Sequence, residues 1–281
     1  MSTVPGGVIS EFGDGVSEQD RFFISDILGD LNATDSDDFF RVLDFTETLP
    51  GAVRFALLRA GVDGVTGADD ENFLVGNSSN NIINGGAGAD TIFAVDGDDI
   101  VYGGSERDVI YGGANNDSIF GDGGDDQIYG NAGDDLIDID NGDDSIFGGQ
   151  GDDTVLSGAG DVVFGNKGDD FFIGDGAPST LYGNEGDDTI VSSGGEDTVY
   201  GGQGDDSIIG GGLTGEYYGN LGNDTYYGGD DPDNFYYLRS GHGRDLVLDF
   251  EIGQDRLIIG MDALPEGATQ ITDIKIEEIG G

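Results

Sequence analysis

The sequence predicts an all-β solenoid built from nonapeptide repeats, and three observations predict it. Residues 67–236 divide into 18 nonapeptides and one octapeptide, residues 157–164, without a break in the pattern. The eighth residue of every unit is apolar, as expected when one side chain per unit points into a narrow core. Gly accounts for 55 of the 281 residues and hydrophobic residues for only 36%, so a conventional two-layer domain with a thick core is not expected.

Each unit follows the pattern G-G-x-G-x-D-x-U-x, where U is apolar, as in residues 85–93, 183–191 and 201–209. Residues seven to nine of a unit are expected to form a three-residue strand whose middle side chain is buried. Residues one to six are expected to form a turn, because glycine permits positive φ and lets backbone carbonyl groups converge. The aspartate at the sixth place then closes the turn with a carboxylate.

The sixth-place aspartates are the candidate metal ligands. Carbonyl and carboxylate groups form a site of hard oxygen ligands, which suits Ca²⁺ better than Mg²⁺, because Mg²⁺ prefers a tighter octahedron and keeps its water. The chain has no Cys and a single His, so thiolate sites are excluded. These candidate ligands are Asp90, Asp99, Asp108, Asp117, Asp126, Asp135, Asp144, Asp153, Asp161, Asp170, Asp188, Asp197, Asp206, Asp224 and Asp233.

The repeat resembles the haemolysin-type calcium-binding repeats of the RTX family, over about three-fifths of the chain. The resemblance implies a parallel β-roll in which two nonapeptides make one turn, which gives about nine turns here. It also implies that calcium lies between turns stacked on the same edge. Because each ion needs two stacked loops, the expected content is about 10 to 15 calcium ions.

The folding of such a roll is expected to depend on calcium. Ordering one residue costs roughly 1–2 kcal/mol, and more for glycine, whereas one buried aliphatic side chain per unit returns only roughly 1.5–3 kcal/mol. Residues 67–236 contain 37 acidic and two basic residues, so bound cations would also relieve repulsion. Ion binding therefore has to supply the missing stability.

Successive units are expected to turn on opposite edges of the roll. Counted from Gly67, every even unit from the fourth onward has the sixth-place aspartate, which predicts a continuous row of calcium on that edge. The odd edge is interrupted, because unit 13 has Ser179 at this place, unit 17 has Gly215, and unit 11 is the octapeptide. A row with gaps is predicted there.

The ninth residue of nine successive odd units is aromatic and is expected to point outward. These residues are Phe93, Tyr111, Tyr129, Phe147, Phe164, Tyr182, Tyr200, Tyr218 and Tyr236. Stacked one per turn at about 4.8 Å, they would form an aromatic ladder on one sheet. The ladder reflects either simple stacking of neighbours or burial against a second copy of the chain or the terminal segments.

The segment before the repeat, residues 1–66, is interpreted as an N-terminal cap or as a contact arm to a neighbouring subunit. Residues 22–27, 38–45 and 52–58 are expected to form strands or a short helix. No secretory signal peptide is recognised at the N-terminus, because residues 1–20 contain neither a basic region nor an apolar core.

The segment after the repeat, residues 237–281, is interpreted as a C-terminal cap. Within it, residues 241–260 resemble the segment that closes the roll of RTX exoproteins, and the match is carried by Asp245, Asp249, Phe250, Gly253 and Asp255. Members of the family leave the cell by type I secretion with an uncleaved C-terminal signal. The resemblance therefore implies a secreted or cell-surface protein.

The net charge of −48 excludes nucleic acid and anionic membranes as partners. No apolar run approaches about 18 residues, so no membrane-spanning segment is expected. The expected partners are calcium and, through the aromatic ladder, a second copy of the chain.

No catalytic motif is found, and the chain is not expected to be an enzyme. A zinc motif of the HExxH type needs two His, and neither G-x-S-x-G nor a Walker A sequence occurs. His242, between two glycines, is interpreted as a turn residue. The first hypothesis is a calcium-dependent structural protein of a surface layer, matrix or filament. The alternatives are a secretion-and-folding module of an exoenzyme, such as a protease or lipase, and a polysaccharide-binding or adhesion module.

Overall fold

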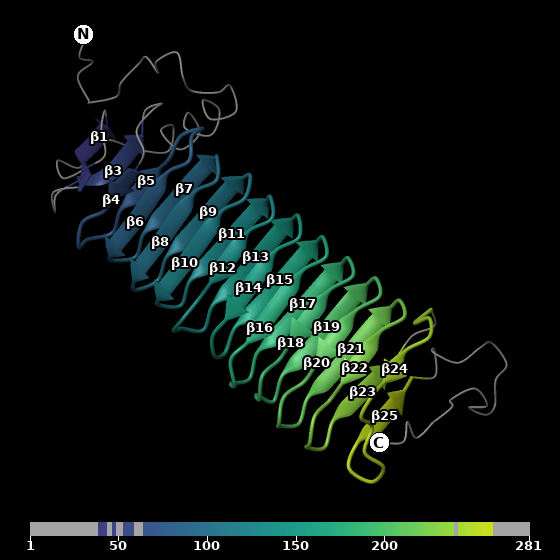
Figure 1. Ribbon diagram of the computed structural model, residues 1–281. Helices are drawn as coiled ribbons and strands as arrows, with labels where there is room; N and C mark the ends of the chain where they lie inside the picture. Colours follow the sequence, from purple (N-terminus) through teal and green to yellow (C-terminus); the bar gives the residue numbers. More distant parts are fainter. Residues whose placement is uncertain (1–38, 44–46, 49–52, 59–63, 239–240, 261–281) are drawn as a thin grey trace. The chain divides into compact units, whose positions relative to one another are not determined.

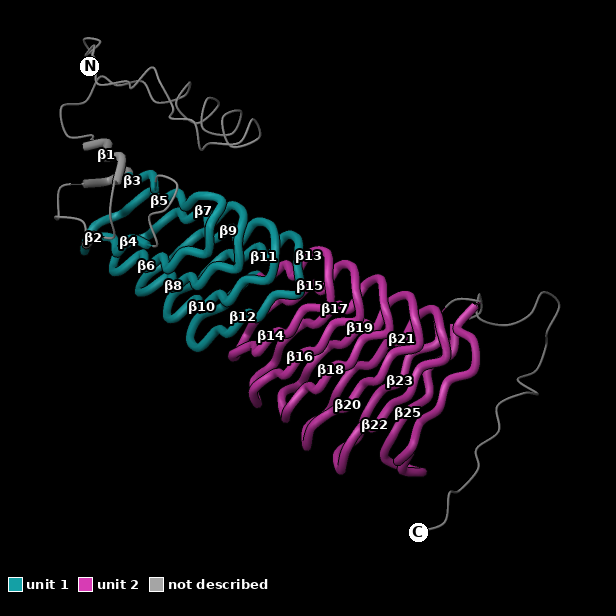
Figure 2. The backbone as a smooth tube through the Cα atoms, turned by 45° about the horizontal axis from the view of Figure 1, so that its top comes forward, with its two compact units in different colours: residues 1–145 teal, residues 146–281 magenta. Residues whose placement is uncertain are grey.

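The structure, a computed structural model, consists of strands and turns, and none of its described residues is helical (Figure 1). The described residues are 39–43, 47–48, 53–58, 64–238 and 241–260. None of them belongs to a helix that could cross a membrane. The expected cap residues 1–38 and 261–281 lie outside this description. The chain divides into two compact units, residues 1–145 and 146–281 (Figure 2), which we describe separately.

The first unit contains two parallel sheets, and successive strands along the chain alternate between them. One sheet has the order β1-β3-β5-β7-β9-β11 and the other β2-β4-β6-β8-β10-β12. The strands are β1 (Phe39–Leu43), β2 (Glu47–Thr48), β3 (Val53–Leu58), β4 (Gly64–Thr66), β5 (Phe73–Val75), β6 (Ile82–Ala87), β7 (Thr91–Asp96), β8 (Ile100–Ser105), β9 (Val109–Ala114), β10 (Ser118–Gly123), β11 (Gln127–Ala132) and β12 (Leu136–Asp138). Ile110 lies beside Ile92 on one side and Ile128 on the other, so each turn of the solenoid takes two nonapeptides.

The second unit repeats this arrangement, with the orders β13-β15-β17-β19-β21-β23-β25 and β14-β16-β18-β20-β22-β24. Its strands are β13 (Ser145–Gln150), β14 (Thr154–Ser157), β15 (Val162–Lys167), β16 (Phe171–Gly174), β17 (Thr180–Glu185), β18 (Thr189–Val191), β19 (Thr198–Gln203), β20 (Ser207–Ile209), β21 (Glu216–Leu221), β22 (Thr225–Tyr227), β23 (Asn234–Tyr237), β24 (Leu246–Val247) and β25 (Arg256–Ile259). Val155 pairs with Phe172 across a turn that is shorter than two nonapeptides, because the octapeptide lies between them. The parallel β-roll predicted from the repeat is therefore confirmed in each unit.

The core consists mainly of the eighth residue of every repeat, as the sequence predicts, and the first-place residues Ala94 and Ile139 are buried as well. The 19 eighth-place side chains are all 0–1% exposed. They are Leu74, Ile83, Ile92, Val101, Ile110, Ile119, Ile128, Ile137, Ile146, Val155, Val163, Phe172, Leu181, Ile190, Val199, Ile208, Tyr217, Tyr226 and Phe235. One buried side chain per repeat makes a thin interior, so hydrophobic burial alone gives each turn little stability.

Many strands are longer than the three residues predicted. β8 and β10, for example, each span six residues, because the first three residues of the next repeat also pair with the neighbouring turn. The prediction that residues one to six form only a turn is wrong for these repeats, although β18 and β20 keep three residues. Small residues let neighbouring turns approach closely enough to continue pairing.

Positive φ is concentrated at the second and fourth places of the repeat. Gly104 (φ 117°) and Asn131 (φ 78°) occupy the second place, and Gly88 (φ 103°) and Asn115 (φ 78°) the fourth. These are the residue types that tolerate the left-handed region best. Val95 (φ 94°) is an exception at the second place, where a β-branched side chain is strained.

The solenoid pattern begins before residue 67. β3 pairs in parallel with β5 and aligns Ala56 with Leu74, and β4 pairs with β6 and aligns Val65 with Ile83. Ala56 and Val65 are both 2% exposed, so they hold the same core position as the eighth residue of a repeat. Of the two alternatives expected for residues 52–58, a strand or a short helix, the structure has a strand, β3, which forms part of the roll.

Candidate cation sites

The sixth-place aspartates form hydrogen-bonded columns along the turn edges of the first unit. The Oδ1 atom of each accepts a hydrogen bond from the backbone N–H of the corresponding residue one turn earlier. On one edge Asp90 donates to Asp108 at 2.7 Å and Asp108 to Asp126 at 2.8 Å. On the other edge Asp99 donates to Asp117 and Asp117 to Asp135, both at 2.8 Å. Each turn is thus tied to the next through a buried carboxylate.

The second unit has one unbroken column and one interrupted column. The unbroken column has donor–acceptor distances of 2.8–3.0 Å and runs through Asp153, Asp170, Asp188, Asp206 and Asp224. On the other edge Ser179 and Gly215 replace the aspartate, and only their backbone N–H groups take part, donating to Asp197 and Asp233. This difference follows the predicted difference between a continuous and a gapped edge, whereas the ion content of each edge stays a prediction.

All fifteen aspartates predicted as ligands are 0–4% exposed. In ten of them the second carboxylate oxygen, Oδ2, is buried without a hydrogen-bond partner. These residues are Asp90, Asp99, Asp108, Asp117, Asp126, Asp170, Asp188, Asp206, Asp224 and Asp233. A buried carboxylate oxygen without a partner carries a large desolvation cost, which a cation would offset.

The raised pKa values of these carboxyl groups reflect the same desolvation cost. Burial raises the pKa of Asp99 and Asp206 to about 8 and that of Asp170 to about 7, although the backbone hydrogen bond to Oδ1 lowers each of them. Neighbouring carboxylates raise the values further. These buried carboxyl groups therefore hold a proton more readily than an exposed aspartate does.

In several loops a backbone carbonyl oxygen lies beside the Oδ2 atom, and the first-place glycines mark the position. A Cβ added to Gly103 would lie 2.7 Å from Oδ2 of Asp108 and 2.8 Å from the carbonyl oxygen of Gly121, one turn later. The same pair of oxygens surrounds Gly112, at 2.6 Å from Oδ2 of Asp117 and 2.9 Å from the carbonyl oxygen of Gly130. Glycine at the first place keeps this cradle of two acceptor oxygens open.

Two acceptors that face each other repel unless a proton or a cation lies between them, and carboxylate with carbonyl oxygen is the ligand set that Ca²⁺ prefers. Within the described residues no three acidic or His side chains converge on one point. The carboxylate and carbonyl oxygens present at these edges therefore fit calcium.

His242 lies between two glycines of positive φ and contacts the carbonyl oxygen of Asn220 at 3.2 Å.

A second column of side chains, at the fifth place, runs along the same edge of the second unit. Here the direction is reversed, because the later residue donates to the earlier one: Asp169 to Asp152 at 2.9 Å, Asp187 to Asp169 at 2.8 Å and Asp205 to Asp187 at 2.7 Å. These side chains are exposed. Sequence reasoning missed their hydrogen bonds, which depend on the stacking of turns.

Two aspartates after the repeat extend the columns, and a third binds the backbone of residues 228–229. Asp224 donates to Asp245 at 2.9 Å, and Asp233 donates to Asp255 at 3.0 Å. Asp249 accepts from the N–H groups of Gly228 and Gly229. Asp245 and Asp255 therefore have the role of sixth-place aspartates, although sequence reasoning did not include them among the ligands. Both lie further along the chain than two nonapeptides would place them, which hides them from the periodic pattern.

The ninth-place aromatic residues form stacked ladders in each unit. In the first unit the ring centroids of Phe93 and Tyr111 are 4.6 Å apart, and those of Tyr111 and Tyr129 4.8 Å. In the second unit the successive separations are 4.3–5.0 Å along Phe147, Phe164, Tyr182, Tyr200, Tyr218 and Tyr236. The rings are nearly parallel, so each covers the face of the next and presents its edge outward.

A scan against protein-family models finds one family, described as the RTX calcium-binding nonapeptide repeat. Its model, which covers four copies of the repeat, matches residues 66–101, 102–137, 140–163, 161–181, 182–212 and 218–236. These matches cover more than half of the chain and coincide with the strands and turns that hold the aspartate columns. A sequence comparison with curated proteins finds no match.

Proposed function

Since the chain belongs to the family of proteins with the RTX calcium-binding nonapeptide repeat, we propose that it is an extracellular protein that folds when it binds Ca²⁺ after type I secretion. The observation that supports this proposal is the set of buried Oδ2 atoms without hydrogen-bond partners. Extracellular calcium modules work at dissociation constants of about 10⁻⁴–10⁻³ M. Such sites fill outside the cell and stay empty in the cytosol.

The residues of the turn edges would hold the ion in a defined way. Within the columns, Oδ1 of an aspartate such as Asp108 is occupied by the preceding turn, which leaves Oδ2 and the neighbouring carbonyl oxygens for the metal. Calcium, when bound, supplies the positive charge that neutralises these acceptors. The glycines at the second and fourth places hold the loop in the left-handed conformations that bring its carbonyl groups together. Folding and ion binding are then one coupled step.

Circular dichroism with and without a chelator tests this step. We expect the β-sheet signal to be lost in EGTA and restored by millimolar calcium but not by magnesium, since Mg²⁺ keeps its water and needs a tighter octahedron. A protein that stays fully ordered after exhaustive chelation would contradict the proposal.

We further propose that the role is structural and involves self-association, because the RTX β-roll is a structural repeat fold. The outward ring edges of the aromatic ladders offer a regular strip for contact with a second copy. They do not favour stacking on sugar rings, because that contact uses the ring faces, which the neighbouring rings already cover.

Light scattering at increasing protein concentration in calcium tests self-association. We expect the particle mass to rise with concentration in wild type and to rise less in Tyr200→Ala, which interrupts the ladder. Tyr227→Ala is the matched control, because Tyr227 lies on the other sheet. A wild-type protein that stays monomeric in calcium would contradict the structural proposal and leave calcium-dependent folding intact.

A further inference from the structure

The inner side chain of each repeat ends beneath the loop of the same repeat. A Cβ at Gly103 would lie 3.2 Å from Cδ1 of Ile110, and a Cβ at Gly112 would lie 3.0 Å from Cδ1 of Ile119. The tip of the eighth-place side chain therefore reaches the wall of the cradle that holds the Oδ2 and carbonyl oxygens. A longer, polar side chain at this place would enter the cradle itself.

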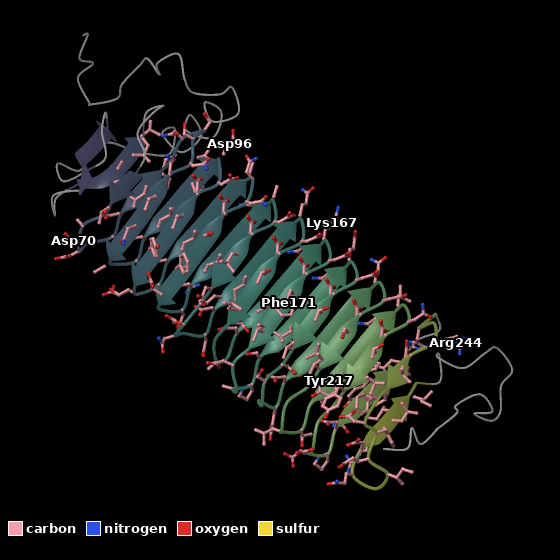
Figure 3. The ribbon with its side chains drawn as sticks, viewed as in Figure 1. Asp70, Asp96, Lys167, Phe171, Tyr217 and Arg244 are labelled. Carbon is pink, nitrogen blue, oxygen red and sulfur yellow. The ribbon has the colours of Figure 1, made fainter. Side chains whose placement is uncertain are left out.

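Tyr217 is such a side chain. It comes from β21 of the second unit (Figure 3), holds the eighth place of repeat 210–218 and is 1% exposed. Its hydroxyl oxygen occupies the position that a Cβ of Gly210 would take, beside the carbonyl oxygen of Gly228. In other loops this position faces an aspartate Oδ2 and the carbonyl oxygen of the next turn. The phenol oxygen thus stands where the carboxylate oxygen stands elsewhere.

The sixth place of the same loop is Gly215, and the two features depend on each other. A Cβ at Gly215 would overlap with the hydroxyl, Cζ and Cε2 atoms of the Tyr217 ring. An aspartate at residue 215 and the observed position of the Tyr217 ring are therefore mutually exclusive. The absence of a carboxylate at residue 215 and the presence of the Tyr217 phenol in the loop are therefore linked.

The chemistry of the exchange removes the need for a cation. A carboxylate and a carbonyl oxygen are both acceptors, whereas a neutral phenol provides an O–H donor that can face a carbonyl oxygen directly. We propose that the Tyr217 hydroxyl replaces the carboxylate and its calcium ion in loop 210–215, so that this turn is closed without metal. The inference builds on the proposed function, because it concerns which loops the ions fill.

The neighbouring repeat shows that a tyrosine at the eighth place does not by itself replace the carboxylate. Tyr226 also reaches its cradle, where its hydroxyl oxygen accepts a hydrogen bond from the N–H of Gly219 at 2.8 Å. That loop keeps Asp224, whose Oδ2 is buried without a hydrogen-bond partner. The metal-free turn is therefore specific to the combination of Gly215 and Tyr217.

A reciprocal exchange of residues tests the proposal. Gly215→Asp with Tyr217→Ile restores the common pattern in loop 210–215, and Asp188→Gly with Ile190→Tyr transfers the exception to loop 183–188. The measurement is bound calcium per chain after equilibrium dialysis, with folding checked by circular dichroism. We expect one ion more in the first variant and one fewer in the second than in wild type. An unchanged ion count in the first variant would overturn the proposal.

Tyr217→Phe keeps the test decisive if the double variants do not fold, because it removes only the hydroxyl. We expect an unchanged ion count and amide hydrogen exchange in residues 210–218 that is at least about fivefold faster in saturating calcium, since a carbonyl oxygen loses its donor. Tyr226→Phe is the control, with unchanged exchange in the same segment. Unchanged exchange in Tyr217→Phe would overturn the proposal. A wild type that binds no calcium would instead overturn the proposed function.

Discussion

Replacing Asp170 with Asn separates the two roles of a sixth-place carboxylate. The Asp170 side chain is 1% exposed, and its Oδ1 accepts the N–H of Asp153 at 2.8 Å. Its Oδ2 has no hydrogen-bond partner and lies near the carbonyl oxygen of Gly183, across the cradle at Gly165. Asn keeps the Oδ1 acceptor and replaces Oδ2 with an amide donor. We expect the hydrogen-bonded column to survive and the ion at this loop to be lost.

The expected magnitude depends on which quantity is measured. Loss of a contact to a charged group costs about 1.5–3 kcal/mol, or roughly 10- to 150-fold in the affinity of one site. If folding is coupled to about ten ions, a loss of about 2 kcal/mol spread over ten binding steps moves the calcium midpoint of folding by only about 1.4-fold. The number of bound ions is therefore the sensitive readout, and the midpoint is not.

In calcium-free buffer the same substitution is expected to stabilise the fold. Burial raises the pKa of Asp170 to about 7, so its negative charge destabilises the metal-free fold at neutral pH. Asn removes that charge, and we expect Asp170→Asn to be more ordered than wild type in EGTA at pH 7 and to bind one calcium ion fewer.

The adjacent variant Asp169→Asn is the matched control. It changes the net charge by the same amount, but Asp169 is exposed and its Oδ1 accepts the N–H of Asp187 at 2.8 Å. Elemental analysis of dialysed protein gives the ion count, and circular dichroism in EGTA gives the residual order. Equal loss of calcium in both variants, or lower order of Asp170→Asn in EGTA, would refute the reasoning.

Three further predictions concern pH, lanthanide substitution and backbone strain. Without calcium, the fold should gain β-sheet signal as pH falls from 8 to 5. Burial raises the pKa of Asp126 to about 6 and that of Asp99 to about 8, so the folded state binds more protons in this range and loses stability as pH rises. A signal that is constant with pH would contradict this prediction. Terbium bound in place of calcium should be sensitised less in Tyr226→Phe than in Tyr227→Phe, because of these two tyrosines Tyr226 is the one whose hydroxyl reaches a cradle. Equal emission from the two variants would count against that assignment. Val95→Gly should stabilise the calcium-bound protein by about 1 kcal/mol or more in thermal melts, because Val95 has φ 94°. The control Asn131→Gly should gain less stability. A lower melting temperature for Val95→Gly would argue against strain.

The parts of the fold that depend on periodicity could be predicted from the sequence. The nonapeptide period fixes which side chain points inward, and the core is formed by the eighth-place residues as expected. The same period continues back through Val65 and Ala56, which is the signal that could have identified β4 and β3 as part of the roll. It was hidden because the glycines and aspartates of the repeat are sparse there.

The parts that depend on contacts between turns could not be predicted. The pairing of Oδ1 with a backbone N–H one turn earlier is set by the stacking distance, which no spacing along the chain reveals. Similarly, Tyr217 fits the apolar pattern of the eighth place, and only the structure shows that its hydroxyl enters the loop. Asp245 and Asp255 were recognised by resemblance, but their place in the columns required the three-dimensional alignment.

The alternation of repeats between two edges has a consequence for how the length of such a chain can change. Insertion or deletion of one nonapeptide would transfer every downstream loop to the opposite edge and break both columns, whereas a change of two nonapeptides preserves them. The octapeptide shows the other tolerated change: Asp153 and Asp170 remain bonded at a separation of 17 residues, and the separation of 18 resumes at Asp188. Duplication within this chain is therefore restricted to pairs of repeats, and a one-residue deletion is accommodated inside a single loop.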